Sequence, residues 1–432
     1  MDKKLVVQEY LKEYSVLVVD KNGSSRNRLL KVMVDLGTKR NMIHTAGTMS
    51  EAQEIIKTQK IGLVLSDYAV GGGSGFDLFK LVRSTFGTTN KNLCLILVTS
   101  NISQTAVAKA AEEDVDSFII KPYTLQSIME NLVSSISAKV KPSPYVVKIE
   151  AGKELLGRGQ YQQAIEVFSS AMTLHSKPSL ALFYMGQAQY LLSEADKAKS
   201  DYNKGLEFNS IHFKCLIGLY EIFMKEEKYE EAYRIVEKIA KYFPANPDRL
   251  TQVIRLTIVT KHYEDMENYY DIFTQLDERN SELTNYIGAG LFISGKYFLL
   301  ENQSPRAIEI FDKIAVSCAE FSKFIRAIIT VLVEHEEFDE AERFMARFSA
   351  GTKDEEDYMV SDFLVSFSRK DSDQAQVVKK GLELYNKNIR DFNCLKLLVN
   401  ALQSQGFKDK HEQYKQELTK LYPDKSKYLA VS

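Results

Sequence analysis

Two patterns of apolar and polar positions divide this chain. Over residues 15–137, short apolar runs at 16–19, 42–46, 63–65, 93–98 and 118–120 alternate with longer segments that mix apolar and polar positions. Runs this short are typical of buried parallel strands, and the segments between them of helices. Five such alternations predict an α/β domain, a five-stranded parallel sheet with helices on both faces.

Hydroxyl residues that can cap a helix mark the expected helix starts in this domain. The predicted starts are Ser24 or Ser25, Ser50, Ser103 and Thr124. The glycine-rich run at 71–75 is not followed by the Lys-Ser or Lys-Thr of a nucleotide P-loop. We expect it to be a turn at the rim of a site.

Beyond residue 144 the pattern becomes helical and repeats every 34 residues. Alanine recurs at this period, and the period resumes after an insertion of seven residues near 281–287. The alanines are Ala164, Ala198 and Ala232, then Ala307, Ala341 and Ala375. This period predicts stacked helix pairs in which small residues let paired helices approach closely. The insertion either bends the array or forms an interface.

The two patterns meet at a segment with two prolines, Pro142 and Pro144. Proline is unfavourable in a helix interior, so we place a boundary there. The expected organisation is a first domain at 1–138, a linker at 139–146 and about eight helix pairs at 147–426.

Four polar residues stand where apolar runs of the first domain end: Asp20, Asp67, Thr99 and Lys121. In an open α/β sheet, sites form outside the carboxyl ends of the strands. A carboxylate, a hydroxyl and an ammonium gathered around Asp67 predict phosphoryl transfer to this aspartate. The negative charge that develops in that reaction requires fixed cations and hydrogen-bond donors.

The first domain resembles the receiver domain of bacterial response regulators, including the single-domain chemotaxis regulator. The matching segments, in order, are V-L-V-V-D ending at Asp20, L-S-D ending at Asp67, L-V-T-S around Thr99 and I-I-K-P around Lys121. The resemblance implies a flavodoxin-like fold with Asp67 as phosphoacceptor. Thr99 and Lys121 would contact the phosphoryl group, and Phe118 would take the aromatic switch position together with Thr99. The Lys121–Pro122 bond would be cis.

The same resemblance implies a Mg²⁺ ion bound by Asp67, by an acid after the first strand and by a backbone carbonyl, here that of Ala69. Hard cations prefer oxygen ligands, and Asp20 can supply one carboxylate. The direct acidic ligand of the family falls on Lys21. A lysine removes a ligand and adds positive charge, so weakened Mg²⁺ binding is expected. Its ammonium could instead pair with Asp20 or Asp67 and partly replace the metal.

The helical region resembles tetratricopeptide repeats, whose first helices line a concave face that binds segments of other proteins. The resemblance implies a groove in this position. The candidate groove residues are Lys153, Phe183, Gln187, Tyr190, Lys214, Glu221 and Arg255. Their mixed charge does not favour a C-terminal carboxylate as ligand.

Composition narrows the function classes. The net charge is −2 and no basic stripe is visible, so nucleic-acid binding is not expected. No stretch reaches the roughly 18 uncharged apolar residues of a membrane span, and the N-terminus lacks a signal-peptide core, which favours a cytoplasmic protein. The four cysteines and six histidines show no metal-site spacing, and no catalytic motif appears, so an enzyme is not expected.

The leading hypothesis is therefore a two-component signalling adaptor. A histidine kinase or phosphotransfer protein phosphorylates Asp67 or docks to the receiver, and the repeats bind a protein or peptide partner in a way that this event controls. The route would run from Asp67 through Thr99 and Phe118 to the surface of the fourth helix, fifth strand and fifth helix. The alternative is a scaffold whose degenerate receiver is never phosphorylated. The sequence leaves homo-oligomerisation open.

Overall fold

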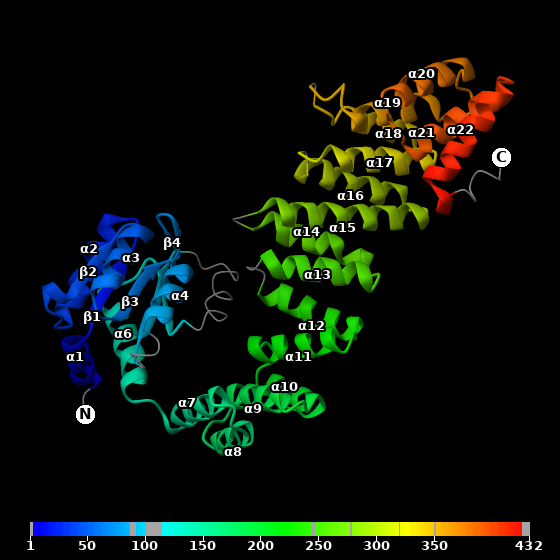
Figure 1. Ribbon diagram of the computed structural model, residues 1–432. Helices are drawn as coiled ribbons and strands as arrows, with labels where there is room; N and C mark the ends of the chain where they lie inside the picture. Colours follow the sequence, from blue (N-terminus) through cyan, green and yellow to red (C-terminus); the bar gives the residue numbers. More distant parts are fainter. Residues whose placement is uncertain are drawn as a thin grey trace. The chain divides into compact units, whose positions relative to one another are not determined.

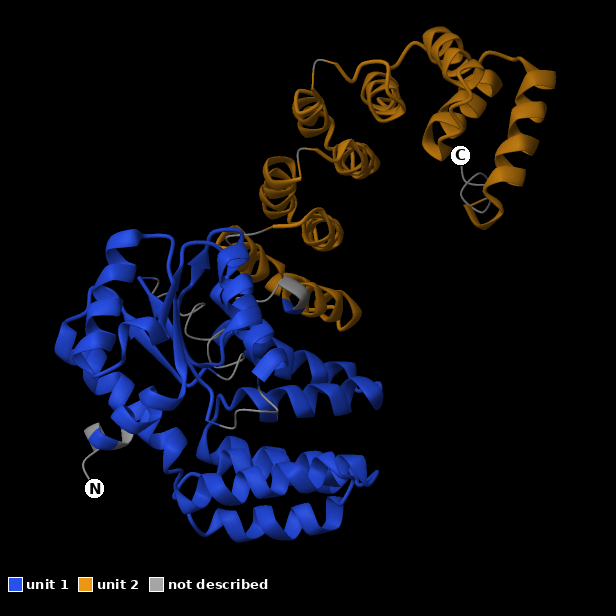
Figure 2. Ribbon diagram, turned by 60° about the vertical axis from the view of Figure 1, so that its left-hand side comes forward, with its two compact units in different colours: residues 1–249 blue, residues 250–432 orange. Residues whose placement is uncertain are grey.

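The computed structural model describes residues 3–86, 92–100, 115–243, 247–276, 279–318, 320–349 and 351–425. The chain divides into two compact units, residues 1–249 and residues 250–432 (Figure 2). The division falls within helix α13 (Pro247–Val259) of the helical region. Each unit is described by itself below.

The predicted five-stranded sheet is confirmed. Its strands pair in the order β2-β1-β3-β6-β7, and every pairing is parallel (Figure 1). This order, in which the second strand lies outside the first, is that of flavodoxin-like doubly wound folds. The strands are β1 (Ser15–Val19), β2 (Ile43–Ala46), β3 (Ile61–Asp67), β6 (Cys94–Thr99) and β7 (Ser117–Ile120).

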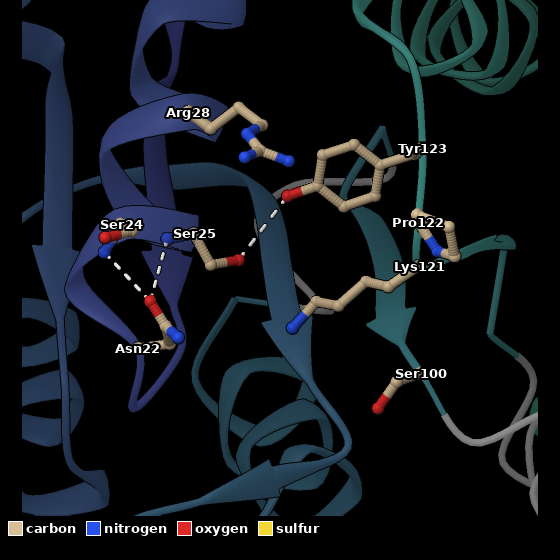
Figure 3. A pocket seen from close by; sticks show the side chains of 8 residues that line it. All are labelled: Asn22, Ser24, Ser25, Arg28, Ser100, Lys121, Pro122 and Tyr123. Carbon is tan, nitrogen blue, oxygen red and sulfur yellow. Dashed lines mark hydrogen bonds between the residues drawn. The ribbon is translucent and has the colours of Figure 1, made fainter.

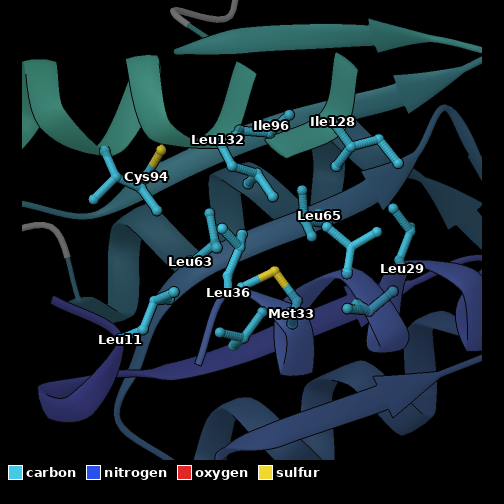
Figure 4. Packing of buried hydrophobic residues seen from close by; sticks show 14 of the residues in the cluster. Leu11, Leu29, Met33, Leu36, Leu63, Leu65, Cys94, Ile96, Ile128 and Leu132 are labelled. Atoms are coloured by element: carbon cyan, nitrogen blue, oxygen red, sulfur yellow. The ribbon is translucent and has the colours of Figure 1, made fainter. Parts of the chain in front are cut away.

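Helices cover both faces of this sheet. One face packs against α1 (Lys3–Glu13), α2 (Gly23–Asp35) and α6 (Leu125–Val140), and the other against α3 (Met49–Thr58) and α4 (Gly75–Phe86). Alternate strand residues point to opposite faces, so Val16 belongs to the first core and Leu17 to the second. Figure 4 shows the first core, in which Leu63 of β3 lies among side chains from α1, α2 and α6. A short 3₁₀ helix, η1 (Arg40–Met42), precedes β2.

Helix α1 was not among the elements predicted from the apolar pattern. Its Leu11 is 1% exposed and its Tyr10 is 4% exposed, and both belong to the first core. The Tyr10 hydroxyl donates hydrogen bonds to the backbone oxygens of Gly62 and Asn92. A side chain at Gly62 would collide with Tyr14, since a Cβ there would lie 2.4 Å from the Tyr14 Cβ. Helix α1 is therefore an integral part of the first domain.

Two of the predicted helix starts lie slightly too late in the sequence, since α2 begins at Gly23 and α3 at Met49. Asn22, rather than Ser24 or Ser25, caps α2, and its side-chain oxygen accepts the backbone N–H groups of both serines at 2.9 and 3.2 Å. Thr48, rather than Ser50, caps α3. An Asx or Thr side chain one turn earlier satisfies the free N–H groups equally well, so the hydroxyls at Ser24, Ser25 and Ser50 did not decide the boundary.

The start at Thr124 is confirmed, because Thr124 and Ser127 form a capping box at α6. The helix predicted from Ser103 lies outside the described residues, as does residue 426 at the predicted end of the array. The glycine run forms part of a small antiparallel pair, β4 (Ala69–Val70) with β5 (Gly73–Ser74). Gly72, between them, has a φ of +88°, which favours glycine.

Within the described residues, the helical region contains eight pairs of helices. Residues 141–143 separate α6 from α7, the first helix of the array. The pairs are α7 (Pro144–Gly157) with α8 (Tyr161–Met172), α9 (Ser179–Leu191) with α10 (Ala195–Phe208), α11 (Phe213–Lys225) with α12 (Tyr229–Tyr242), α13 (Pro247–Val259) with η2 (Tyr263–Asp265) and α14 (Met266–Thr274), α15 (Ser281–Leu300) with α16 (Ser304–Ser317), α17 (Ser322–Glu334) with α18 (Phe338–Met345), α19 (Glu356–Phe367) with α20 (Gln374–Asn386), and α21 (Phe392–Ser404) with α22 (Lys408–Leu421). Among the described residues, no helix is both long and apolar enough to cross a membrane.

The 34-residue period also appears in the backbone. The turn inside each early pair contains one residue with positive φ, and these residues are Gly159, Ser193, Glu227 and Lys261, then Asn302 and Glu336. This left-handed residue ends the first helix and turns the chain into the second. The predicted alanines are fully buried as far as Ala341, whereas Ala375 is exposed. In that pair Val377 and Gly381 of α20 are buried instead.

The seven-residue insertion lengthens one helix. First helices elsewhere in the array have 12 to 14 residues, whereas α15 has 20. Seven residues make about two helical turns, so the added turns keep the same face of the helix towards its neighbours. Leu283 and Ile287 of the added turns are buried. The insertion therefore adds contact surface in the interior of the second unit.

Candidate functional site

The four polar residues predicted at the strand ends lie at one edge of the sheet. Asp20 follows β1 directly, Asp67 ends β3 and Thr99 ends β6, while Lys121 follows β7. Strands β1, β3, β6 and β7 are neighbours in that order, and in the ladder Asp67 pairs with Val98. Because all strands are parallel, their carboxyl ends meet at the same edge.

A single ammonium group joins the two carboxylates. Lys121 Nζ donates hydrogen bonds to Asp20 Oδ2 at 2.7 Å and to Asp67 Oδ2 at 3.1 Å. The other oxygen of each carboxylate accepts a backbone N–H group, that of Asn22 for Asp20 and that of Tyr68 for Asp67, both at 2.8 Å. Each carboxylate is thus fixed by a backbone donor, and the lysine provides the shared positive charge.

Burial and hydrogen bonding compete at this cluster. Asp20 is 1% exposed, so burial alone would raise its pKa, but hydrogen bonds from Lys121, Ser25 and the Asn22 amide hold the pKa below its usual value. Burial likewise opposes the charge of Lys121, yet its two carboxylate partners raise its pKa. Hydrogen bonding therefore favours the charged forms of Asp20 and Lys121.

Thr99 and Phe118 differ in how deeply they are buried near the cluster. Thr99 is 4% exposed, and its backbone oxygen accepts the Lys121 N–H at 2.7 Å, which ties the ends of β6 and β7 together. Phe118 lies on β7, pairs with Leu97 and is 39% exposed. The Lys121–Pro122 bond is cis. Thr99 is therefore buried at the end of β6 next to Lys121 in the ladder, whereas Phe118 is exposed on β7.

The residues expected to hold a divalent cation fit that role incompletely. Lys21 is exposed and, within the part of the chain that the structure describes, makes no hydrogen bond or ion pair. The expectation that it pairs with Asp20 or Asp67 is not met, since Lys121 occupies that role. Ala69 lies in β4 at the surface. Two carboxylates that already share an ammonium, next to Lys21, make a poor set of ligands for Mg²⁺.

Beside the cluster lies a pocket of about 410 Å³ that the sequence analysis did not predict. It lies between the start of α2 and the loop after β7 (Figure 3). Arg28 stacks over the Tyr123 ring at 5.9 Å, and the Tyr123 hydroxyl lies 3.4 Å from Ser25 Oγ. The lining residues are Asn22, Ser24, Ser25, Arg28, Ser100, Lys121, Pro122 and Tyr123. The lining thus carries the Arg28 guanidinium, four hydroxyl groups and the Lys121 ammonium, which Asp20 and Asp67 already share.

The predicted groove residues all lie on first helices of the array. Six belong to the first unit, on α7, α9 and α11, while Arg255 is exposed on α13 in the second unit. Three of the six come together around a ring that was not predicted, that of Tyr184. Lys153 Nζ and Lys214 Nζ each lie 5.9 Å from the centre of this ring, and the Phe183 ring lies 4.9 Å from it.

The remaining groove residues are more dispersed. Tyr190 lies under the ammonium of Lys225, whose Nζ is 5.3 Å from the ring centre. Gln187 is half-buried and Glu221 is exposed. The face of the first three pairs thus has an aromatic centre with lysines on both sides, a combination that suits acidic or aromatic side chains of a ligand.

Comparisons with known proteins bear on the first domain. Residues 16–133 match the family described as response regulator receiver domain. Chemotaxis protein CheY-3 of Vibrio cholerae is 26% identical over 121 residues, which are 28% of this chain and 90% of that protein. Chemotaxis protein CheY of Pseudomonas aeruginosa is 25% identical over 117 residues, 27% of this chain and 91% of that protein. The first domain is a receiver domain.

The helical region is similar to solved tetratricopeptide structures. One is the structure described as YrrB, a TPR protein with an unusual peptide-binding site. It is 16% identical, covers 46% of this chain and 96% of that chain, and has a TM-score of 0.27.

Proposed function

We propose that this receiver-bearing chain is a two-component signalling adaptor, in which the state of Asp67 controls what the helical array binds. The observation that carries the proposal is the cluster at the strand ends, where one ammonium bridges Asp67 and a second carboxylate. A phosphoryl group on Asp67 would compete for that ammonium. A change in the position of Lys121 would also alter the end of β7, because the Lys121 backbone N–H donates a hydrogen bond to the Thr99 backbone oxygen.

The proposed chemistry is transfer of a phosphoryl group to a carboxylate. An oxygen of Asp67 attacks phosphorus, the bond between phosphorus and the donor breaks, and the leaving group departs with the electron pair. In this proposal Lys121 then pairs with a phosphoryl oxygen, and the Thr99 hydroxyl donates to another. Arg28 and the hydroxyl groups of the pocket beside Lys121 support access by an anionic donor, whether a small phosphodonor or the phosphohistidine of a kinase or phosphotransfer protein.

The test is the intact mass of the full chain after incubation with a small acyl phosphate and Mg²⁺. The proposal expects a gain of one phosphoryl group that is lost in Asp67→Asn. The matched control is Asp77→Asn, an exposed aspartate on α4, which should gain the phosphoryl group normally. An unchanged wild-type mass would contradict phosphorylation and favour the second candidate.

The second candidate is a scaffold whose receiver docks to a partner without being phosphorylated. It is favoured by Lys21, which puts an exposed cation where a metal-binding acid is expected. The variant Lys21→Asp separates the two candidates. If it gains Mg²⁺ binding and phosphorylation while partner binding by the array is unchanged, the scaffold is the better description. If partner binding changes with phosphorylation, the adaptor is the better description.

For the array we propose binding of a protein segment along the first helices. The lysines and rings around Tyr184 support this in the first unit. Replacing Lys153 and Lys214 together by Glu should weaken binding of an acidic partner about tenfold or more, since like charges then face each other. The same double change at Lys197 and Lys241, exposed on second helices, should leave it within about twofold.

A further inference from the structure

Several helix pairs of the array close the space between their two helices with an aromatic ring. In three of them a ring on the second helix lies against a glycine on the first. The three contacts are Gly152 with Phe168, Gly186 with Tyr202 and Gly295 with Phe311. A Cβ added to any of these glycines would lie 2.2–2.6 Å from a ring carbon, so the ring fills the space between closely approaching helices.

The pair α19–α20 lacks this arrangement. Counted by the 34-residue period, with the seven-residue insertion allowed for, the glycine position of α19 holds Phe363 and the ring position of α20 holds Lys379. Phe363 is buried, whereas Lys379 is exposed, as is the alanine of this period, Ala375. At this position α20 therefore has no ring to place against α19.

A pocket of about 190 Å³ is lined by these two helices and by Lys353 from the segment before α19 (Figure 1). Its apolar lining includes Met359, Phe363 and Phe367 of α19 and Leu384 of α20. A cavity of roughly 150 Å³ is enough to hold one benzene ring, so this pocket has room for a single ring with a short substituent.

The apolar side chains favour an aromatic ligand over an aliphatic one. The ring centres of Phe363 and Phe367 lie 5.2 Å apart, and the Met359 thioether lines the same pocket. Aromatic rings gain from tilted contacts with other rings and from contact with a thioether sulfur. A ring bound here would have both kinds of neighbour.

The charged side chains favour a single negative charge on that ligand. Lys387 Nζ lies 3.3 Å from the Met359 sulfur, a weak acceptor, and it forms no ion pair within the described part of the chain. Lys380 is instead paired with Glu383 at 2.8 Å. The whole lining has three lysines and two acids, which leaves one positive charge in surplus. One carboxylate matches this surplus, whereas several would meet the two acids.

We propose that the α19–α20 pocket binds a free aromatic monocarboxylate with one ring, its carboxylate on Lys387 and its ring against Met359 and Phe363. The ligand supplies the ring that α20 lacks and so joins α19 to α20. This inference goes beyond the adaptor function, and its failure would leave the proposal for Asp67 unaffected. The competing occupant is an apolar side chain of a partner protein.

The test is titration of the full chain with phenylacetate, followed by ligand-observed NMR. The variant is Lys387→Met, which removes the charge of an exposed side chain, and thermal unfolding without ligand checks that it folds. The matched control is Lys379→Met, on α20 but outside the lining. We expect phenylacetate to bind the control within about twofold of the wild type and Lys387→Met at least about fivefold more weakly.

Hydrogen exchange in the full chain locates the site. Bound phenylacetate should slow exchange of peptides from α19 and α20, because a ligand that joins the two helices opposes their local opening. Peptides from α9 and α10, whose space Tyr202 fills, should exchange at an unchanged rate. Slower exchange in α9 and α10 but not in α19 and α20 would contradict the assigned site.

Two further probes test the ligand chemistry. Phenethylamine has the ring with the opposite charge, and acetate has the charge without the ring, so each should bind at least about tenfold more weakly than phenylacetate. Equal binding of either probe, or unchanged affinity in Lys387→Met, would overturn the inference. Protection of α19 and α20 only by a bound partner protein, with no effect of phenylacetate, would assign the pocket to a side chain of that partner instead.

Discussion

At the scale of single residues, Lys121 is the group on which the receiver site depends. Its ammonium is the positive charge between Asp20 and Asp67, of which Asp20 is almost fully buried. Removing one partner of such a cluster leaves like charges facing each other without compensation. The remaining backbone donors do not neutralise either carboxylate.

We therefore predict that Lys121→Met lowers the free energy of unfolding of the receiver domain by about 2 kcal/mol, less than for a fully enclosed ion pair because Lys121 and Asp67 are partly exposed. Lys21→Met, which removes an exposed lysine one residue from Asp20, should change it by less than about 0.5 kcal/mol. Hydrogen exchange of peptides from β1 and β3 in the full chain measures both. Equal effects of the two substitutions would contradict the assigned role of Lys121.

The same cluster makes the stability of the receiver domain depend on pH. The pKa of Asp20 is lower in the folded chain than its usual value. The unfolded chain therefore binds its proton first, so this residue adds stability above its unfolded pKa, about 4, and that stability is lost as the pH falls further. Urea unfolding of the receiver should show a fall in stability below about pH 4 that is smaller in Asp20→Asn. An equally steep fall in that variant would assign the effect to other carboxylates.

The sequence could identify Asp20, Asp67, Thr99 and Lys121 because strand ends are readable from apolar runs and parallel strands bring those ends together. It could not identify the pocket of Arg28 and Tyr123. Those residues come from a helix and a loop whose approach depends on tertiary packing. It also misjudged Lys21, since only the fold shows that Lys121 already occupies both carboxylates.

At the scale of elements, close helix packing in the array depends on small residues. A Cβ at Gly152 of α7 would lie 2.2 Å from the Phe168 ring of α8, whereas one at Gly157 would meet nothing within 4 Å. Gly152→Ala should therefore destabilise the first helix pairs by roughly 1–3 kcal/mol through overpacking. Gly157→Ala, in the same helix, should be neutral or stabilise by up to about 1 kcal/mol. Thermal unfolding of both variants compares them, and equal melting temperatures would contradict the packing of α7 on α8.

Helix α1 offers a second test at this scale. Tyr10→Phe removes a hydroxyl whose proton lies within hydrogen-bonding reach of two backbone oxygens, a buried one of Gly62 and a partly buried one of Asn92, so the receiver should lose about 1–2 kcal/mol of stability. Glu9→Gln, at an exposed neighbouring position, should have an effect below about 0.5 kcal/mol. Denaturant unfolding gives both values. An unchanged stability in Tyr10→Phe would mean that α1 is not required by the receiver.

The sequence carried a signal for α1 that was not used, because Val7, Tyr10, Leu11 and Tyr14 have the spacing of one helical face. The extra length of α15 could be read only as an insertion of seven residues. Whether seven residues form a loop, a bend or two helical turns depends on neighbours such as Phe324, which packs against Gly288. Helix caps were likewise uncertain by one turn, since several polar residues near each start can satisfy the same N–H groups.

At the scale of the whole molecule, the chain joins two folds with different roles. The receiver concentrates charge at one edge of a sheet, and the array repeats a helix pair to present a long surface. The period of 34 residues and the alternation of strands and helices identified these folds from the sequence alone. Neither pattern identifies what the array binds, because binding depends on which exposed side chains neighbouring first helices bring together.

The central claim is that the state of Asp67 controls partner binding by the array. The most direct measurement is a quantitative affinity purification with the full chain from cell extract, with and without a small acyl phosphate, for the wild type and for Asp67→Asn. We predict that phosphodonor changes the amount of at least one bound partner severalfold in the wild type and not in Asp67→Asn. The same partners in the same amounts under all four conditions would contradict the claim.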